Sequence, residues 1–229
     1  MRDWWTVLHP PYTLWHLSYV VIGACITGPV NAERLVVTLV AFFLAVGIGA
    51  HALDELHGRP LGTSIATWQL VLASALGLSG AVALGIAGMI VVSPYLALFI
   101  SVGVIIAVGY NLELLHGSLH TNAVFALGWG AFPVLTSYFA QQGKISVVSV
   151  TAALFAALLS QAQRQLSSPA RDLRRRTSSV EGKIVQSNGT LVRITKDTLL
   201  QPLESTLRTL CWAVVALALA LVAARFHLP

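Results

Sequence analysis

The stretch Leu35-Val-Val-Thr-Leu-Val-Ala-Phe-Phe-Leu-Ala-Val-Gly-Ile-Gly-Ala50 is an apolar run that leads into the ionisable segment His51-Ala-Leu-Asp54-Glu55-Leu-His57-Gly58. A predominantly apolar segment of about 20 residues is long enough to cross the hydrocarbon core of a bilayer as a helix. Ionisable groups at membrane depth are costly and usually mark functional sites. The stretch therefore predicts a membrane helix over 35–55 with a functional site at its end.

A second segment, Glu113-Leu-Leu-His116-Gly117-Ser-Leu-His120, repeats this pattern after another apolar run. Asp54 and His57, like Glu113 and His116, are a carboxylate and an imidazole three residues apart, which places each pair on one helical face. Helical bundles present metal ligands inward with this spacing. The two segments therefore predict a metal site, with His16 as a possible additional ligand. The expected ligands are His51, Asp54, Glu55, His57, Glu113, His116 and His120.

The composition indicates an integral membrane protein. Of 229 residues, 56% are hydrophobic and 10% are charged, whereas soluble domains contain about 25% charged residues. The mean hydropathy is +0.76. Cys25 and Cys211 both lie in apolar runs and say nothing about the redox compartment. No cleavable signal peptide is recognisable. No glycine-rich phosphate loop is present. No nucleic-acid motif is present either, so we expect no nucleic-acid partner.

Seven apolar segments predict seven membrane-spanning helices, at 13–28, 35–55, 66–88, 92–115, 120–140, 145–166 and 206–226. Eleven of the 14 lysines and arginines fall on one side of this arrangement, which the positive-inside rule assigns to the cytoplasm. The N-terminus and both ionisable segments are then cytoplasmic. We expect residues 1–166 to form a six-helix bundle that carries the site, and residues 206–229 to form the last helix and a short tail.

Residues 167–205 are expected to be a polar cytoplasmic segment. Two short β-prone pieces, at 183–186 and 190–195, flank the turn signal Asn188-Gly189. The basic residues Arg59, Arg171, Arg174 and Arg175 suit contact with an anionic substrate. The arginine cluster after residue 170 equally suits a topology anchor on anionic lipid headgroups, and this alternative stays open.

The chain resembles the UbiA superfamily of intramembrane prenyltransferases over about residues 8–165. The stretch Ala50-His51-Ala-Leu-Asp54-Glu-Leu-His57-Gly58-Arg59-Pro60 matches the family's aspartate-rich motif at the cytoplasmic end of its second helix. Tyr110-Asn111 resembles the family's tyrosine after the fourth helix, and 127–133 resembles its fifth, small-residue-rich helix. The resemblance implies an all-α, UbiA-like transmembrane bundle with a cavity open to the cytoplasm and the lipid, and a lipophilic or isoprenoid-type substrate.

The chain departs from this family at the metal-binding positions. Only Asp54 of the first aspartate motif is in register, because His51 and Gly58 occupy aspartate positions. No paired aspartates follow the sixth helix. Mg²⁺ prefers oxygen ligands, whereas imidazole favours Fe or Zn. The substitutions therefore predict a transition-metal site, possibly dinuclear, in place of a magnesium site.

Three functions are consistent with these patterns. The leading one is a UbiA-like membrane metalloenzyme that acts on a lipophilic substrate. The alternatives are a divergent Mg²⁺-dependent prenyltransferase and a non-enzymatic metal or haem binding membrane protein. Membrane lipids, and a second copy of the chain, are further possible partners. His9 is expected at the membrane interface and His227 on the opposite side, both outside the site.

Overall fold

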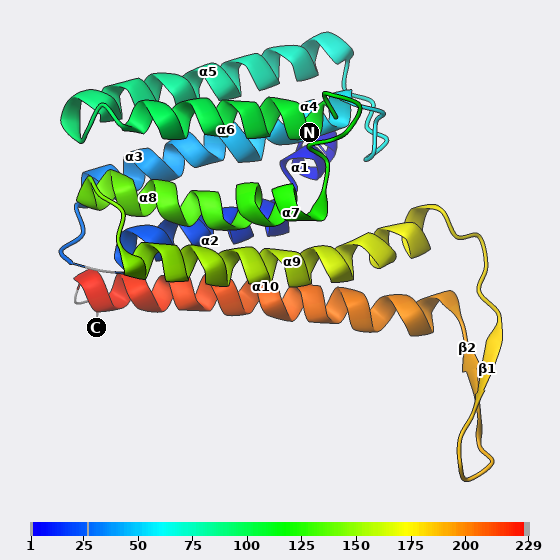
Figure 1. Cartoon of the computed structure of the whole chain (residues 1–229). Helices are drawn as coiled ribbons and strands as arrows, with labels where there is room; N and C mark the ends of the chain where they lie inside the picture. Colours follow the sequence, from blue (N-terminus) through cyan, green and yellow to red (C-terminus); the bar gives the residue numbers. More distant parts are fainter. Residues whose placement is uncertain (1, 27, 227–229) are drawn as a thin grey trace.

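The structure is a computed structural model that describes residues 2–26 and 28–226, so His227 lies outside the described residues. It is built almost entirely from helices (Figure 1). Two wide, π-helical segments, η1 and η2, interrupt longer helices. The elements are α1 (Arg2–Leu8), α2 (Pro10–Cys25), α3 (Ala32–Phe42), η1 (Phe43–Ala50), α4 (His51–Leu56), α5 (Thr67–Val91), α6 (Leu96–Asn111), α7 (Asn122–Phe125), η2 (Ala126–Ala131), α8 (Phe132–Gln142), α9 (Val147–Arg175), β1 (Gly182–Val185), β2 (Leu191–Ile194) and α10 (Lys196–Phe226).

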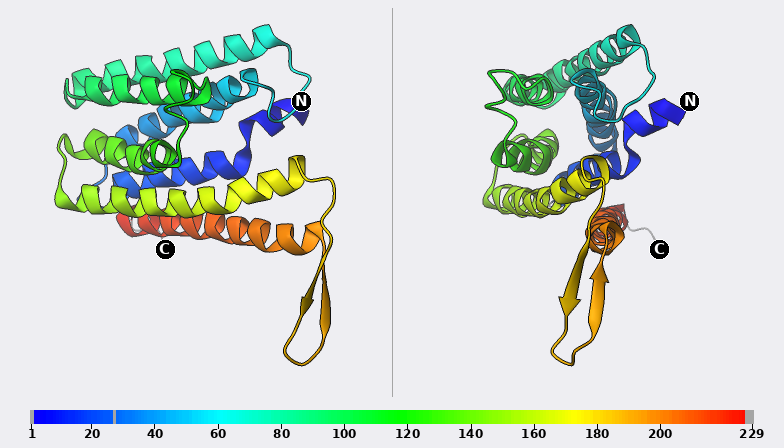
Figure 2. Two further views of the ribbon diagram at one scale, coloured as in Figure 1. Left: turned by 45° about the vertical axis from the view of Figure 1, so that its right-hand side comes forward. Right: turned by 90° about the vertical axis from the view of Figure 1, so that its right-hand side faces the viewer.

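Seven long helical segments run side by side in alternating directions (Figures 1 and 2). They are α2, the continuous α3–η1–α4, α5, α6, the continuous α7–η2–α8, α9 and α10. One end of the bundle carries the loops 57–66 and 112–121 and the last turns of α9. We call it the basic end, because 11 of the 14 lysines and arginines belong to it.

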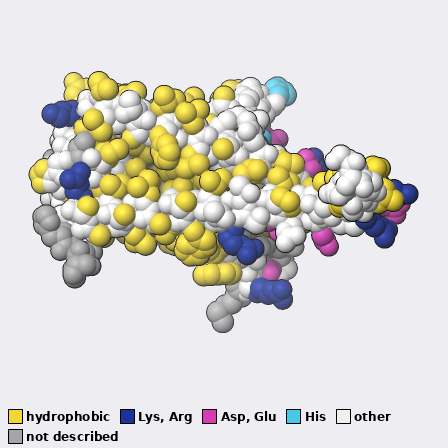
Figure 3. All heavy atoms as spheres, turned by 90° about the horizontal axis from the view of Figure 1, so that it is seen from below, with side chains coloured by type: hydrophobic (Ala, Val, Ile, Leu, Met, Phe, Trp, Pro, Cys, Tyr) yellow, Lys and Arg dark blue, Asp and Glu magenta, His cyan; other side chains and the backbone are white. Residues whose placement is uncertain are grey.

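The helices confirm an all-α integral membrane protein. Five of them are long and apolar enough to cross a bilayer: 32–56, 67–91, 122–142, 147–175 and 196–226. Hydrophobic side chains cover most of the helical surface, and charged side chains gather toward the end that bears the hairpin (Figure 3). The expectation of seven crossings stays a prediction, because α2 and α6 have 16 residues each, or about 24 Å of helix.

Helix α2 lies at the centre of the bundle and packs against α3, α8 and α10. Small residues allow this close packing: Gly23 lies against the backbone of Val134 in α8. Hydrogen bonds also tie α2 to α9, where the buried Tyr19 hydroxyl donates to the Ala156 carbonyl at 3.2 Å and accepts from the Ser160 hydroxyl at 3.1 Å. The core is therefore fixed by direct backbone approach as well as by apolar side chains.

The segment expected to be polar, 167–205, is partly helical. Helix α9 continues through Pro169 to Arg175, and α10 begins at Lys196. Between them β1 and β2 form an antiparallel hairpin, in agreement with the two β-prone pieces and the turn at Asn188-Gly189. The helix continues because residues 164–175 still present one buried side, with Ser167 and Ala170 buried against the bundle.

The contact of α2 with α8 predicts an asymmetric response of two helical glycines. A methyl group at Gly23 would overlap Ser137 Oγ and the Val134 carbonyl oxygen and lie 2.9 Å from Val134 Cα. Gly23→Ala should therefore lower the free energy of unfolding by about 1–3 kcal/mol, since overpacking forces backbone shifts. Thermal unfolding in detergent, followed by circular dichroism, measures the change.

Gly80→Ala is the matched control, because a methyl group there meets only the flexible end of Leu44. This variant should unfold at or slightly above the wild-type temperature, since alanine favours helix over glycine. Equal unfolding temperatures for Gly23→Ala and the wild type would show that the α2–α8 contact is loose.

Candidate functional site

A cavity of about 600 Å³ opens at the basic end of the bundle, among α2, α4, α9 and α10. Its walls combine apolar and aromatic residues with ionisable ones. Leu14 and Trp212 line it and are also 42% and 60% exposed, so the cavity reaches the apolar outer surface between α2 and α10. The ionisable lining residues are His9, His16, His51, Asp54, His120, Arg164, Arg171, Arg174, Arg175, Glu204 and Arg208.

Three histidines form the inner part of this cavity. The rings of His9 and His51 lie 6.0 Å apart between centroids, and the Nδ1 atoms of both are buried without a hydrogen-bond partner among the described residues. His16 is buried, donates from Nδ1 to the Tyr12 carbonyl at 2.7 Å, and packs edge-on against Trp129. The cavity is thus lined by imidazoles that form few hydrogen bonds within the protein.

His9 is placed by an unusual backbone. It lies between α1 and α2 with φ 47°, a left-handed conformation that non-glycine residues seldom adopt, immediately before Pro10-Pro11. Burial lowers the pKa of His9 to about 4, and the nearby positive charges of Arg175, Arg174 and Arg171 lower it further. At neutral pH this imidazole is therefore uncharged, and it can accept one hydrogen bond and donate one.

The outer part of the cavity is strongly basic. Arg164, Arg171 and Arg175 recur at helical spacing along α9, and Arg208 faces them from α10. Arg174 forms an ion pair with Glu204, which links α9 to α10. Among the described residues, Arg171, Arg175 and Arg208 have no ion-pair partner. The mouth therefore holds an excess of positive charge over the carboxylates of Asp54 and Glu204.

His120 acts as a support for Arg164. Its Nδ1 lies 3.2 Å from the Tyr110 carbonyl and its Nε2 lies 3.3 Å from Arg164 Nη2. The guanidinium must donate, so Nε2 accepts and Nδ1 carries the proton. Arg164 is held further by Asn122 Oδ1 at 3.1 Å and by the Phe125 ring at 5.0 Å. Both ring nitrogens of His120 are therefore engaged.

Two of the predicted site residues shape the loop 57–66 instead of the cavity. Glu55 is fully buried, and its carboxylate accepts hydrogen bonds from Leu61 N, Thr63 N and Thr63 Oγ1 at 2.8–2.9 Å. Arg59 donates to the Ile65 carbonyl at 2.7 Å and to Thr67 Oγ1 at 3.0 Å. Neither residue lines the cavity, so their polar groups organise the loop that follows α4.

The two ionisable segments meet at the surface. Glu113 Oε2 lies 3.7 Å from His57 Nε2, and Glu113 Oε1 lies 3.6 Å from His120 Nδ1. The side chains of His57 and Glu113 are about half exposed. His116 is exposed and has φ 58°, in a loop where Glu113 and Leu115 also have positive φ. Of the seven predicted ligands, only His51, Asp54 and His120 line the cavity.

The donors present do not form a ready metal site. Within residues 2–26 and 28–226, no group of three or more His, Cys, Asp or Glu side chains is arranged to hold a metal ion. Glu55 is committed to the loop and His120 to Arg164. The donors that remain for the predicted transition metal are therefore His9, His51 and Asp54, which all line the cavity.

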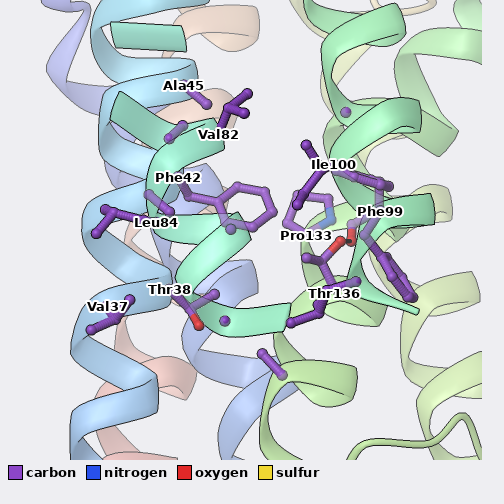
Figure 4. Close-up of a pocket in the computed structure, with 18 of the residues that line it drawn as sticks. Val37, Thr38, Phe42, Ala45, Val82, Leu84, Phe99, Ile100, Pro133 and Thr136 are labelled. Carbon is purple, nitrogen blue, oxygen red and sulfur yellow. Dashed lines mark hydrogen bonds between the residues drawn. The ribbon is translucent and has the colours of Figure 1, made fainter. Parts of the chain in front are cut away.

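A second, apolar cavity of about 360 Å³ lies among α3, α5, α6 and α8. Phe42 and Ile100 point toward each other across it (Figure 4). Val46 in η1 and Trp129 in η2 line this cavity and the basic one alike. The two cavities therefore share a wall of two side chains, both placed by π-helical segments, which often occur at functional sites.

Sequence reasoning missed several lining residues. His9 was expected at the membrane interface, yet it lines the cavity, because its left-handed backbone turns the chain just before Pro10. Arg164 and Arg208 were used only as markers of orientation. The spacing of Arg164, Arg171 and Arg175 is a helical signal, which was hidden because α9 was expected to end at residue 166.

Comparison with known proteins does not assign this arrangement to a family. No family model matches the chain, and no curated protein or solved structure matches it. The resemblance to the UbiA superfamily therefore rests on the sequence motifs alone.

The role of Glu55 in the loop predicts that its removal affects folding. Glu55→Ala leaves two backbone N–H groups without their acceptor and should lower the free energy of unfolding by about 1–3 kcal/mol. The loop 57–66 should become sensitive to protease in limited proteolysis. Glu113→Ala, at an exposed carboxylate, should leave both unchanged; equal effects of the two variants would contradict a structural role specific to Glu55.

Proposed function

We propose that this chain is an integral membrane protein that binds, and acts on, a lipophilic substrate with an anionic headgroup. The headgroup lies among the cavity arginines, and the hydrocarbon part lies against the apolar walls. This proposal keeps the predicted lipophilic or isoprenoid-type substrate. It places the site at the basic end, which the positive-inside rule assigns to the cytoplasm.

The proposal depends mainly on one observation. Guanidinium groups without an ion pair and imidazoles with few hydrogen bonds line the same cavity, and this cavity also has an apolar side. Arg171, Arg175 and Arg208 have no carboxylate partner among the described residues, and guanidinium groups bind phosphate and carboxylate groups through paired hydrogen bonds. Leu14 and Trp212 at the outer surface suit entry of a hydrocarbon chain from the bilayer. A small hydrophilic anion would gain nothing from contact with these apolar side chains.

The imidazoles give the cavity its chemistry. The proposed roles follow from their surroundings: His9 and His51 line the same cavity as Asp54, and their Nδ1 atoms have no close partner among the described residues, so they can hydrogen-bond the headgroup. The arginines neutralise the anion and hold it in place. His120 positions Arg164 without contacting the substrate itself. This distribution of roles suits an enzyme of prenyltransferase-like type without requiring the family's aspartate motifs.

The anion requirement is tested with two probes that differ only in their headgroup. Farnesyl diphosphate and farnesol are titrated against the purified protein, and the fluorescence of the cavity tryptophans Trp15, Trp129 and Trp212 reports binding. We expect the diphosphate to bind more tightly than the alcohol. Arg175→Gln should weaken diphosphate binding about tenfold, which corresponds to the loss of one charge-assisted hydrogen bond.

Arg176→Gln is the matched control, since this neighbour is exposed, pairs with Asp172 at 3.5 Å and does not line the cavity. It should bind the diphosphate like the wild type. Equal affinity for the two probes, or the same loss in both variants, would refute an anionic headgroup site in the cavity.

A second candidate function is binding of a transition metal, favoured by the unpartnered Nδ1 atoms of His9 and His51. Fe or Zn suits this nitrogen-rich surrounding better than Mg²⁺. Elemental analysis of the purified protein tests it. The wild type and His116→Ala should carry the same metal content, and His51→Ala should lose it, because His116 is exposed and outside the cavity. A wild type without transition metal, or unchanged content in His51→Ala, would exclude this function.

A further inference from the structure

The hairpin of β1 and β2 projects sideways from the bundle. It leaves the basic end roughly perpendicular to α9 and α10 and extends beyond α10, away from the other helices (Figures 1 and 2). Because the long helices run along the membrane normal, a perpendicular arm runs along the membrane plane. The hairpin therefore extends over the lipid that surrounds α10.

The depth of this arm matches the lipid headgroups. Helix α9 has 29 residues, or about 43 Å, which exceeds the hydrocarbon thickness of about 30 Å. Its last turns and the root of the hairpin therefore lie beyond the hydrocarbon. Lys196 fixes this root by donating from Nζ to the Thr177 carbonyl at 2.9 Å and to the Arg174 carbonyl at 3.3 Å.

The two faces of the hairpin differ in chemistry. The register pairs Ile184 with Val192 and Gly182 with Ile194, so one face is apolar. The other face pairs Lys183 directly with Arg193 and Val185 with Leu191. Like charges opposite each other destabilise a hairpin unless an anion lies between them. The Lys183–Arg193 pair therefore indicates an anionic ligand, and this evidence is independent of the apolar face.

Nothing within the described chain covers this arm. Ile184, on the apolar face, is 49% exposed; Val185 and Leu191, beside Lys183 and Arg193 on the other face, are 68% and 63% exposed. A lone two-stranded hairpin is only marginally stable in water. Within 182–194 the charged residues are Lys183 and Arg193, both basic, and neither has an ion-pair partner among the described residues. Both the exposed apolar side chains and the excess positive charge call for an amphipathic, anionic surface.

We propose that residues 182–194 lie on the membrane surface beside the bundle and bind the headgroups of anionic phospholipids. Ile184, Val192 and Ile194 face the hydrocarbon boundary, and the Lys183–Arg193 pair lies among the phosphates. Interfacial elements with an apolar face and basic side chains bind anionic membranes in this way. This site is separate from the cavity and does not depend on the function proposed for it.

The test places an environment-sensitive NBD fluorophore on Ile184→Cys in the full chain, with the buried Cys25 and Cys211 replaced by alanine. The protein is reconstituted into vesicles of phosphatidylcholine alone, or of phosphatidylcholine and phosphatidylglycerol in equal amounts. We expect a blue shift and a severalfold rise of the emission in the anionic vesicles. High salt should reduce both, since it screens contacts between exposed charges.

The double variant Lys183→Glu, Arg193→Glu should lose the difference between the two lipids. Lys144→Glu, an exposed lysine at the opposite end, should keep it. Identical emission in the two kinds of vesicle would overturn the proposal. So would a signal that rises with the density of protein in the vesicle and not with phosphatidylglycerol, because it would assign the apolar face to a second copy of the chain.

Discussion

Hydrocarbon offers no hydrogen-bond partners, so each backbone polar group in a membrane helix must be paired within the protein, and the carbonyls at helix ends are the difficult ones. Three cations away from the cavity meet this demand. Arg225 donates to the Cys25 and Ile26 carbonyls, which end α2, and Arg34 donates to the Gln141 carbonyl, which ends α8. Lys196 does the same for α9.

Several arginines of the basic cavity differ from these helix-capping cations. Arg59 is committed to its loop and Arg174 to Glu204, whereas Arg171, Arg175 and Arg208 serve no such purpose within the described residues. They line the same cavity as His9, whose positive charge is suppressed by burial. The cavity thus has a positively charged mouth and a largely apolar interior, and this combination suits an amphipathic ligand.

Hydropathy and charge predicted the membrane class, the helical fold and the meeting of the two ionisable segments at one end of the bundle. These features follow from local composition and from the alternation of helices. The exact ligand set was not accessible in this way. Glu55 and Asp54 are neighbours in sequence, yet one binds a loop and the other lines the cavity, because the path of residues 57–66 decides which carboxylate is used.

The end of α9 was equally inaccessible. The expected membrane helix ends at residue 166, whereas α9 continues through Pro169 to Arg175, with Ser167 and Ala170 buried against the bundle. The helical spacing that places Arg171 and Arg175 on one side with Arg164 was therefore not apparent. His9 escaped for a similar reason: its position depends on a left-handed residue before Pro10, which no periodicity indicates.

The π-helical segment η1 has a consequence for how this chain is compared with others. A π segment absorbs about one extra residue per wide turn, so a regular α-helix with the same sequence would rotate His51 and Asp54 by about 100° away from the cavity. A relative with a regular helix at this place would be one residue shorter between Phe43 and Ala50. Alignments of this helix therefore need a single-residue gap there, and a gap-free alignment would pair the cavity-lining positions with the wrong neighbours.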